Sequence, residues 1–163
     1  RTGAGVAEDR AVAAAWYRRA AEEGLPEAQF NLAVLNAEGE GIAADPAAAI
    51  DWYTRAAEQG HAKAQVNLGY ALAAGLGVAR DLAQTATWYR RAAESGHATA
   101  QYNLGVIYAA GEGVPQDFAT AIDWYRRAAA QGHAQVLFNL GVLTAQGRGI
   151  ARDPGEAARP DTQ

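Results

Sequence analysis

The chain has 163 residues, half of them hydrophobic, and a formal net charge of −4, so it has enough apolar material for a folded core. The acidic balance argues against a nucleic-acid-binding protein, because such proteins present a basic face to phosphate. The absence of cysteine excludes disulfides and thiolate metal sites, and no run of about 18 apolar residues is present that could span a membrane.

Marker residues recur along the chain at a constant spacing of 36 positions. The recurring residues are Trp16, Trp52, Trp88 and Trp124; Gly24, Gly60, Gly96 and Gly132; and Leu32, Leu68, Leu104 and Leu140. A fixed period of about 20 to 50 residues is typical of a solenoid, in which each unit is too small to bury its own apolar face. We predict four repeats, at 8–41, 45–77, 81–113 and 117–149. An aborted fifth repeat is expected at 150–163, where Pro160 occupies the tryptophan position.

Each repeat is predicted to contain two antiparallel helices. In the second repeat, Asp45 and Pro46 form an N-cap and first-turn pair, and Gly60 is expected to end the helix that begins there. Its predicted core stripe is Ala49, Trp52, Tyr53, Ala56 and Ala57. A second helix is predicted from about 62 to 74, ending before Gly75. The fold class expected is therefore all-α, a right-handed α/α solenoid of antiparallel helix pairs.

Two segments carry a family resemblance, "AQYNLGVIYAAGEGV" at 100–114 and "AIDWYRRAAAQGH" at 121–133. Both resemble the Sel1-like repeat, a relative of the tetratricopeptide repeat, and the likeness covers nearly the whole chain. The resemblance implies an α-solenoid scaffold that binds proteins and performs no chemistry. It also implies that the helix bearing "NLG" lines the concave side and the helix bearing "WY" the outer side.

Positions at which the repeats differ from one another are informative about function, because the solenoid itself does not determine them. On the "NLG" helix, three such lines fall at i, i+3 and i+7 and share one face. The predicted groove residues are Phe30, Val34, Lys63, Val66, Tyr70, Tyr102, Val106, Phe138 and Val142. We expect this face to bind a partner protein or peptide, with its aromatic side chains as anchors. The alternative is that the same side chains pack against the adjacent repeat.

An asparagine recurs inside each mostly apolar "NLG" helix, where a buried amide must find hydrogen-bond partners. The four are Asn31, Asn67, Asn103 and Asn139. One interpretation is a side-chain ladder that ties the turn of one repeat to the next. The other, which the family resemblance suggests, is that they grip the backbone or carboxylate of a bound peptide.

The residues that could support catalysis are few. Ser95 is the only serine, and His61, His97 and His133 share one register position, so helix pairs separate them and no common metal site is expected. We therefore expect no enzyme, no cofactor and no metal. A hydrolase or a cell-wall-ligand-binding protein is kept as a minor alternative. Some cysteine-rich Sel1-like proteins are linked to β-lactam binding, but this chain lacks the cysteines.

Charge and the two chain ends lead to the remaining expectations. Arginines on the "WY" helices, such as Arg55 and Arg91, are expected to be neutralised by the glutamates three positions later. The aborted fifth repeat would leave the last "NLG" helix thinly covered, so a self-associating or spacer module that docks through the solenoid ends is the alternative function.

Arginine greatly outnumbers the single lysine, Lys63, which indicates a GC-rich bacterial genome. Either cytoplasm or periplasm remains open as the compartment. The first ten residues lack a methionine and an apolar signal core and are typical of a cut within a longer chain.

Overall fold

The computed structural model describes residues 3–132 and 134–149, and within these ranges the secondary structure is helical with no strand. The helices are α1 (Gly3–Glu22), α2 (Pro26–Glu38), α3 (Pro46–Glu58), α4 (Ala62–Ala74), α5 (Leu82–Glu94), α6 (Ala98–Ala110), α7 (Phe118–Ala130) and α8 (Ala134–Ala145). Extensive packing joins only helices that are consecutive in the chain. The prediction of an all-α solenoid of helix pairs is confirmed.

The helices begin and end where local sequence signals place them. Asp45, Asp81 and Asp117 cap α3, α5 and α7, and in each case Oδ1 accepts a hydrogen bond of 2.9–3.0 Å from the backbone N–H three residues later. After α3, Gly60 adopts a φ of +87°, and after α4, Gly75 adopts a φ of +71°. Glycine reaches this left-handed region without steric cost, so the predicted bounds of both helices hold.

The core of each repeat is built mainly from alanine with a few larger aliphatic side chains, and the second, third and fourth repeats each add a buried tyrosine. In the second repeat, Ala49, Tyr53, Ala56 and Ala57 are buried as predicted, together with Leu68 and Leu72 of α4. Trp52 packs on this core as predicted, but it is only half-buried and also packs on the cluster of Ala21, Ala28 and Leu32 in the preceding repeat. The tryptophan therefore contributes to the boundary between repeats, whereas Trp16, with no described repeat before it, is 63% exposed.

The second and third repeats are approached closely by the repeats that follow them because the "NLG" glycine has no side chain, whereas the first repeat carries Ala33 at this position. A Cβ placed on Gly69 would lie 2.8 Å from a ring carbon of Tyr89, and one on Gly105 would lie 2.6 Å from the ring of Tyr125. The tyrosine of one repeat thus packs directly on the helix backbone of the repeat before it.

Buried glutamines add polar contacts within the repeats and at the junctions between them. In the first three repeats one glutamine donates from Nε2 to a carbonyl near the end of the preceding helix; these bonds are Gln29 to Ala21, Gln65 to Ala57 and Gln101 to Ala93, at 3.0–3.1 Å. In two junctions a second glutamine donates to the Oε1 of the first; these bonds are Gln59 to Gln29 and Gln131 to Gln101, both 2.8 Å. At the middle junction the second position is Ser95, and the buried Gln65 Oε1 has no hydrogen-bond partner in the described part of the chain.

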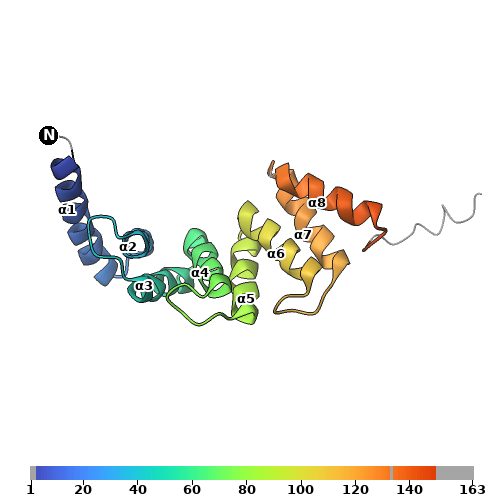
Figure 1. The fold of residues 1–163 in the computed structure, drawn as a ribbon, viewed down its shortest axis with the longest axis horizontal. Helices are drawn as coiled ribbons and strands as arrows, with labels where there is room; N and C mark the ends of the chain where they lie inside the picture. Colours follow the sequence, from blue (N-terminus) through green and yellow to red (C-terminus); the bar gives the residue numbers. More distant parts are fainter. Residues whose placement is uncertain (1–2, 133, 150–163) are drawn as a thin grey trace, which may run out of the picture.

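The repeats stack into a bent array (Figure 1). In this view α4 and α6 lie toward the side to which both ends of the array turn, relative to α3 and α5. No helix among the described residues is long and apolar enough to cross a lipid bilayer. The predicted fifth repeat, including Pro160, lies outside the described residues, and α1 begins at Gly3, ahead of the predicted first-repeat boundary.

Candidate partner-binding surface

The predicted groove residues divide into an exposed set and a half-buried set. Tyr70 is 60% exposed and Phe138 is 68% exposed, while Val106 and Val142 each retain more than a third of their surface. Lys63 is also exposed. Because Tyr70 and Val106 have described repeats on both sides of them, neighbouring repeats leave these two side chains open.

The half-buried set consists of Phe30, Val34, Val66 and Tyr102, which pack against the following repeat. The Phe30 ring lies 4.8 Å from the His61 ring in a stacked arrangement and 6.0 Å from the Tyr53 ring. Tyr102 makes the equivalent tilted contact with Tyr125, also at 6.0 Å. For these positions the alternative stated from the sequence, packing between repeats, describes the contacts observed.

The recurring asparagines bond within a repeat. Asn67 Nδ2 donates to the hydroxyl of Tyr53 at 3.1 Å, and Asn139 Nδ2 donates to that of Tyr125 at 3.3 Å. Each bond joins the two helices of one repeat, so the ladder between successive repeats was the wrong interpretation. Asn103 makes the corresponding bond to Tyr89, and Asn31 is half-buried on α2.

These tyrosines are neutral phenols under ordinary conditions. Burial raises the pKa of Tyr53, the hydrogen bond from Asn67 opposes that rise, and the nearby Glu38 carboxylate adds to it. The pKa values of Tyr89 and Tyr125 are also raised, again chiefly by burial. The Tyr–Asn pairs are therefore uncharged hydrogen-bonding groups.

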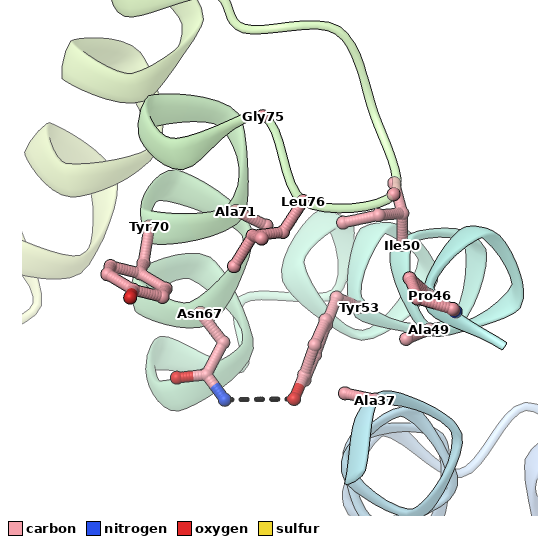
Figure 2. Close-up of a pocket in the computed structure, with 11 residues that line it drawn as sticks. Ala37, Pro46, Ala49, Ile50, Tyr53, Asn67, Tyr70, Ala71, Gly75 and Leu76 are labelled. Carbon is pink, nitrogen blue, oxygen red and sulfur yellow. Dashed lines mark hydrogen bonds between the residues drawn. The ribbon is translucent and has the colours of Figure 1, made fainter. Parts of the chain in front are cut away.

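A cavity of about 480 Å³ opens beside the Tyr53–Asn67 pair (Figure 2). Its walls come from the end of α2, from α3 and α4, and from the turn after α4. The apolar lining comprises Ala37, Pro46, Ala49, Ile50, Ala71 and Leu76, with Gly75 and Gly77 in the turn, and the polar side chains are Tyr53, Asn67 and Tyr70. The cavity thus joins one exposed groove residue, Tyr70, to one of the predicted peptide-gripping residues, Asn67.

The Sel1 repeat family model matches residues 1–25, 26–61, 62–97, 98–133 and 134–159. The chain belongs to the Sel1 repeat family. Proteins built from these repeats generally mediate protein–protein interactions and are generally non-catalytic scaffolds. No match was found among curated protein sequences.

Solved structures of similar proteins come from bacteria. The chain is similar to a Sel1 repeat protein from Oxalobacter formigenes, with 37% identity, a TM-score of 0.82, and coverage of 90% of this chain and 60% of that one. It is also similar to c5321, a protective antigen present in uropathogenic Escherichia coli strains, with 38% identity, a TM-score of 0.84, and coverage of 88% and 31%. The chain therefore spans less than two thirds of either protein. Helicobacter pylori cysteine rich protein B shares the fold at 22% identity and a TM-score of 0.67, over 85% of this chain and 99% of that one.

One arginine in each of the four repeats lies over a tryptophan ring. The guanidinium carbon of Arg55 lies 4.6 Å from the ring centroid of Trp52, and Arg91 and Arg127 lie at 4.7 and 4.6 Å from Trp88 and Trp124. Within the described ranges no ion pair joins Arg55 to Glu58 or Arg91 to Glu94, so that expectation was wrong. A guanidinium on an aromatic face keeps its charge at the surface while covering apolar area.

His61 and His97 occupy the N-cap positions of α4 and α6, but the His97 side chain makes no capping hydrogen bond. His61 Nδ1 accepts a hydrogen bond from the backbone N–H of Ala64 at 3.2 Å, and its Nε2 lies 2.9 Å from Glu27 Oε2. For His97, burial and then the charge of Lys63 lower the pKa. His133 lies outside the described residues, and no group of three metal-ligating side chains occurs among those described.

Sequence reasoning missed the cavity in the second Sel1 repeat. Its signal was present in the register: Ala71 stands where other repeats carry Leu35, Ile107 and Leu143, and Leu76 stands where they carry Glu40, Glu112 and Arg148. A search confined to aromatic residues and to one helix face could not find a site formed by a small side chain and a turn.

Proposed function

We propose that this chain is a non-catalytic scaffold that binds a partner protein or peptide along the exposed face of α4 and α6, the face predicted to line the groove. Its central residues are Tyr70 and Val106, flanked by Lys63 and, on α8, by Phe138 and Val142. Asn67 and its register mates Asn31, Asn103 and Asn139 are proposed to offer amide groups to a bound peptide.

One observation carries the proposal, namely the exposure of Tyr70. Its side chain is 60% exposed although repeats on both sides are present to cover it, and the next residue along the same line, Val106, is 38% exposed. Large aromatic side chains left open on a rigid surface are characteristic of binding hot spots. Phe138 extends the apolar line, but the helix that register would place against it falls on 154–163, outside the described residues.

The test compares two double variants as bait in pull-downs from a lysate of the encoding organism. Tyr70→Ser with Val106→Ser changes the proposed surface, and Asp51→Ser with Thr87→Ser changes exposed positions on α3 and α5. Circular dichroism first establishes that both double variants retain the helical content of the parent chain.

We expect a partner that the parent chain and the α3/α5 variant retain and that the α4/α6 variant loses. Retention of the same partner by all three proteins would contradict binding through the α4/α6 face, because loss of two central apolar contacts typically costs more than about 1 kcal/mol each at a hot spot.

A further inference from the structure

The cavity in the second Sel1 repeat exists because one core position is small. The register mates of Ala71 are Leu35, Ile107 and Leu143, and both Ile107 and Leu143 are buried in the core clusters of their own repeats. Ala71 is itself buried, and the space that a branched side chain fills in the other repeats here remains open. Native cores rarely leave space of this size unfilled.

At the rim of the cavity, two side chains are more apolar or larger than those at the equivalent positions of the other repeats. Leu76 is 50% exposed at a turn position that is charged in the other repeats, and Tyr70 replaces a valine found at all three equivalent positions. Neither change improves packing within the solenoid, because both side chains lie largely in solvent. The small side chain of Ala71 inside the cavity and the apolar side chains of Tyr70 and Leu76 at its rim together form a pocket suited to an apolar ligand.

The polar groups of the pocket are neutral and gathered on one wall. Asn67 uses its Nδ2 to bond Tyr53, and its Oδ1 lies on the side of the amide away from the Tyr53 hydroxyl (Figure 2). No described residue donates a hydrogen bond to that oxygen. It is therefore an acceptor suited to a backbone N–H of a peptide whose side chain enters the pocket.

The charges in and around the pocket indicate which residue types a bound peptide should place in it and next to it. No ionised group lines the pocket, so a charged side chain would lose its hydration there without gaining a partner. Glu38 is exposed beside Ala37 at the end of α2, near enough to act on Tyr53, and makes no ion pair with any described residue. A basic residue of the partner placed next to the anchor would meet this carboxylate.

We propose that the pocket of the second repeat receives one uncharged apolar side chain, between leucine and tryptophan in size, from a partner peptide that carries a lysine or arginine next to it. This inference rests on the proposed function and assigns its main anchor point.

The probe is a phage-displayed library of random twelve-residue peptides, selected on the parent chain. Enriched peptides are synthesised and their Kd measured by fluorescence anisotropy on purified variants. Ala71→Leu fills the pocket with the side chain that the first and fourth repeats carry, and Leu76→Glu restores the glutamate of the first and third. Both substitutions copy the chain's own pattern, so the fold is retained, and Leu76→Glu does so without touching the core.

We expect the enriched peptides to share an apolar residue beside a basic one, and to bind each pocket variant at least about tenfold more weakly. Glu38→Gln should weaken binding by about two- to fivefold and reduce its salt dependence, as expected for an exposed pair. Asp51→Ser with Thr87→Ser serves as the unaffected control.

Two results would overturn the pocket assignment. If enriched peptides bind Ala71→Leu and Leu76→Glu as tightly as the parent but lose affinity with Val106→Ser, the proposed surface stands and the pocket is not its anchor. If selection yields no enriched peptide, or only acidic peptides, the assignment also fails. The lysate comparison of the α4/α6 and α3/α5 variants then judges the scaffold function separately.

Discussion

Replacing Ser95 by glutamine should stabilise the protein. The backbone already suits the change, because Ser95 has φ and ψ of −78° and 2°, close to the −82° and 5° of Gln59 at the equivalent position. A glutamine there would donate from Nε2 to Gln65 Oε1, as Gln59 does to Gln29 at 2.8 Å. The buried oxygen that now lacks a partner would be satisfied.

The expected gain follows from two opposing contributions. Satisfying a buried acceptor recovers about 1–3 kcal/mol, and ordering a glutamine side chain costs up to about 1.5–2 kcal/mol. The bond from Ser95 Oγ to the Ala92 carbonyl, 2.8 Å long, is also lost. We therefore expect the free energy of unfolding to rise by about 0.5–1 kcal/mol.

Urea unfolding followed by circular dichroism gives the overall change, and native-state hydrogen exchange of the amides around the α5–α6 turn shows whether it is local. Exchange is needed because repeat arrays can lose cooperativity between units. Ser95→Glu is the matched control: it has nearly the shape of glutamine and the identity of Glu23 in the first repeat, but its carboxylate cannot donate to Gln65 Oε1.

The reciprocal change is Gln131→Ser, which removes bonds to Gln101 Oε1 and to the Gly96 carbonyl at 2.8 and 2.9 Å. It should destabilise the third and fourth repeats by about 1–3 kcal/mol. The reasoning would be refuted if Ser95→Glu stabilised as much as Ser95→Gln, or if Ser95→Gln gave no gain while Gln131→Ser was costly.

Two further predictions concern the junctions between repeats. Gly105→Ala should lower the free energy of unfolding by about 1–3 kcal/mol, because the new Cβ would overlap the Tyr125 ring; a loss under about 0.5 kcal/mol in the same urea experiment would show that the ring moves aside freely. For His97, burial and Lys63 hold the pKa below its ordinary value near 6.5, so the unfolded chain takes up the proton first as pH falls. Stability should be full above about pH 6.5 and decline below it, less steeply in Lys63→Gln, and equal slopes in urea titrations of the two proteins from pH 7.5 to 5 would contradict this.

The fold could be predicted from the sequence because the repeat period and the local signals for helix starts and ends agreed with one another. The 36-residue period, the Asp–Pro cap at Asp45 and the glycine stops at Gly60 and Gly75 all specify the same helices. Trp52 lies on the predicted stripe, but its second contact with the preceding repeat could not be predicted, because an amphipathic stripe gives only the direction of an apolar face.

The candidate surface was harder to predict for a related reason. Phe30, Tyr70 and Tyr102 share one face of the "NLG" helices, yet only Tyr70 remains mostly exposed. The difference depends on how far the next repeat's tyrosine reaches over each position, which depends on packing between repeats. The pocket beside Ala71 depends on a side chain that is smaller than those at the equivalent positions of the other repeats. A comparison of the repeats in register shows this difference, but a search for aromatic residues on one helix face does not.

The restriction of packing to consecutive helices has a consequence for how this architecture can change. A whole unit can be duplicated or excised in register while the main helix contacts elsewhere are kept, provided that the new neighbours supply a tyrosine to face each "NLG" glycine. The length of the solenoid can therefore change without a change in the residues that bind a partner. Specificity held by an adjacent pair of units, such as the first and second around the pocket, would be inherited by longer or shorter arrays that keep this pair.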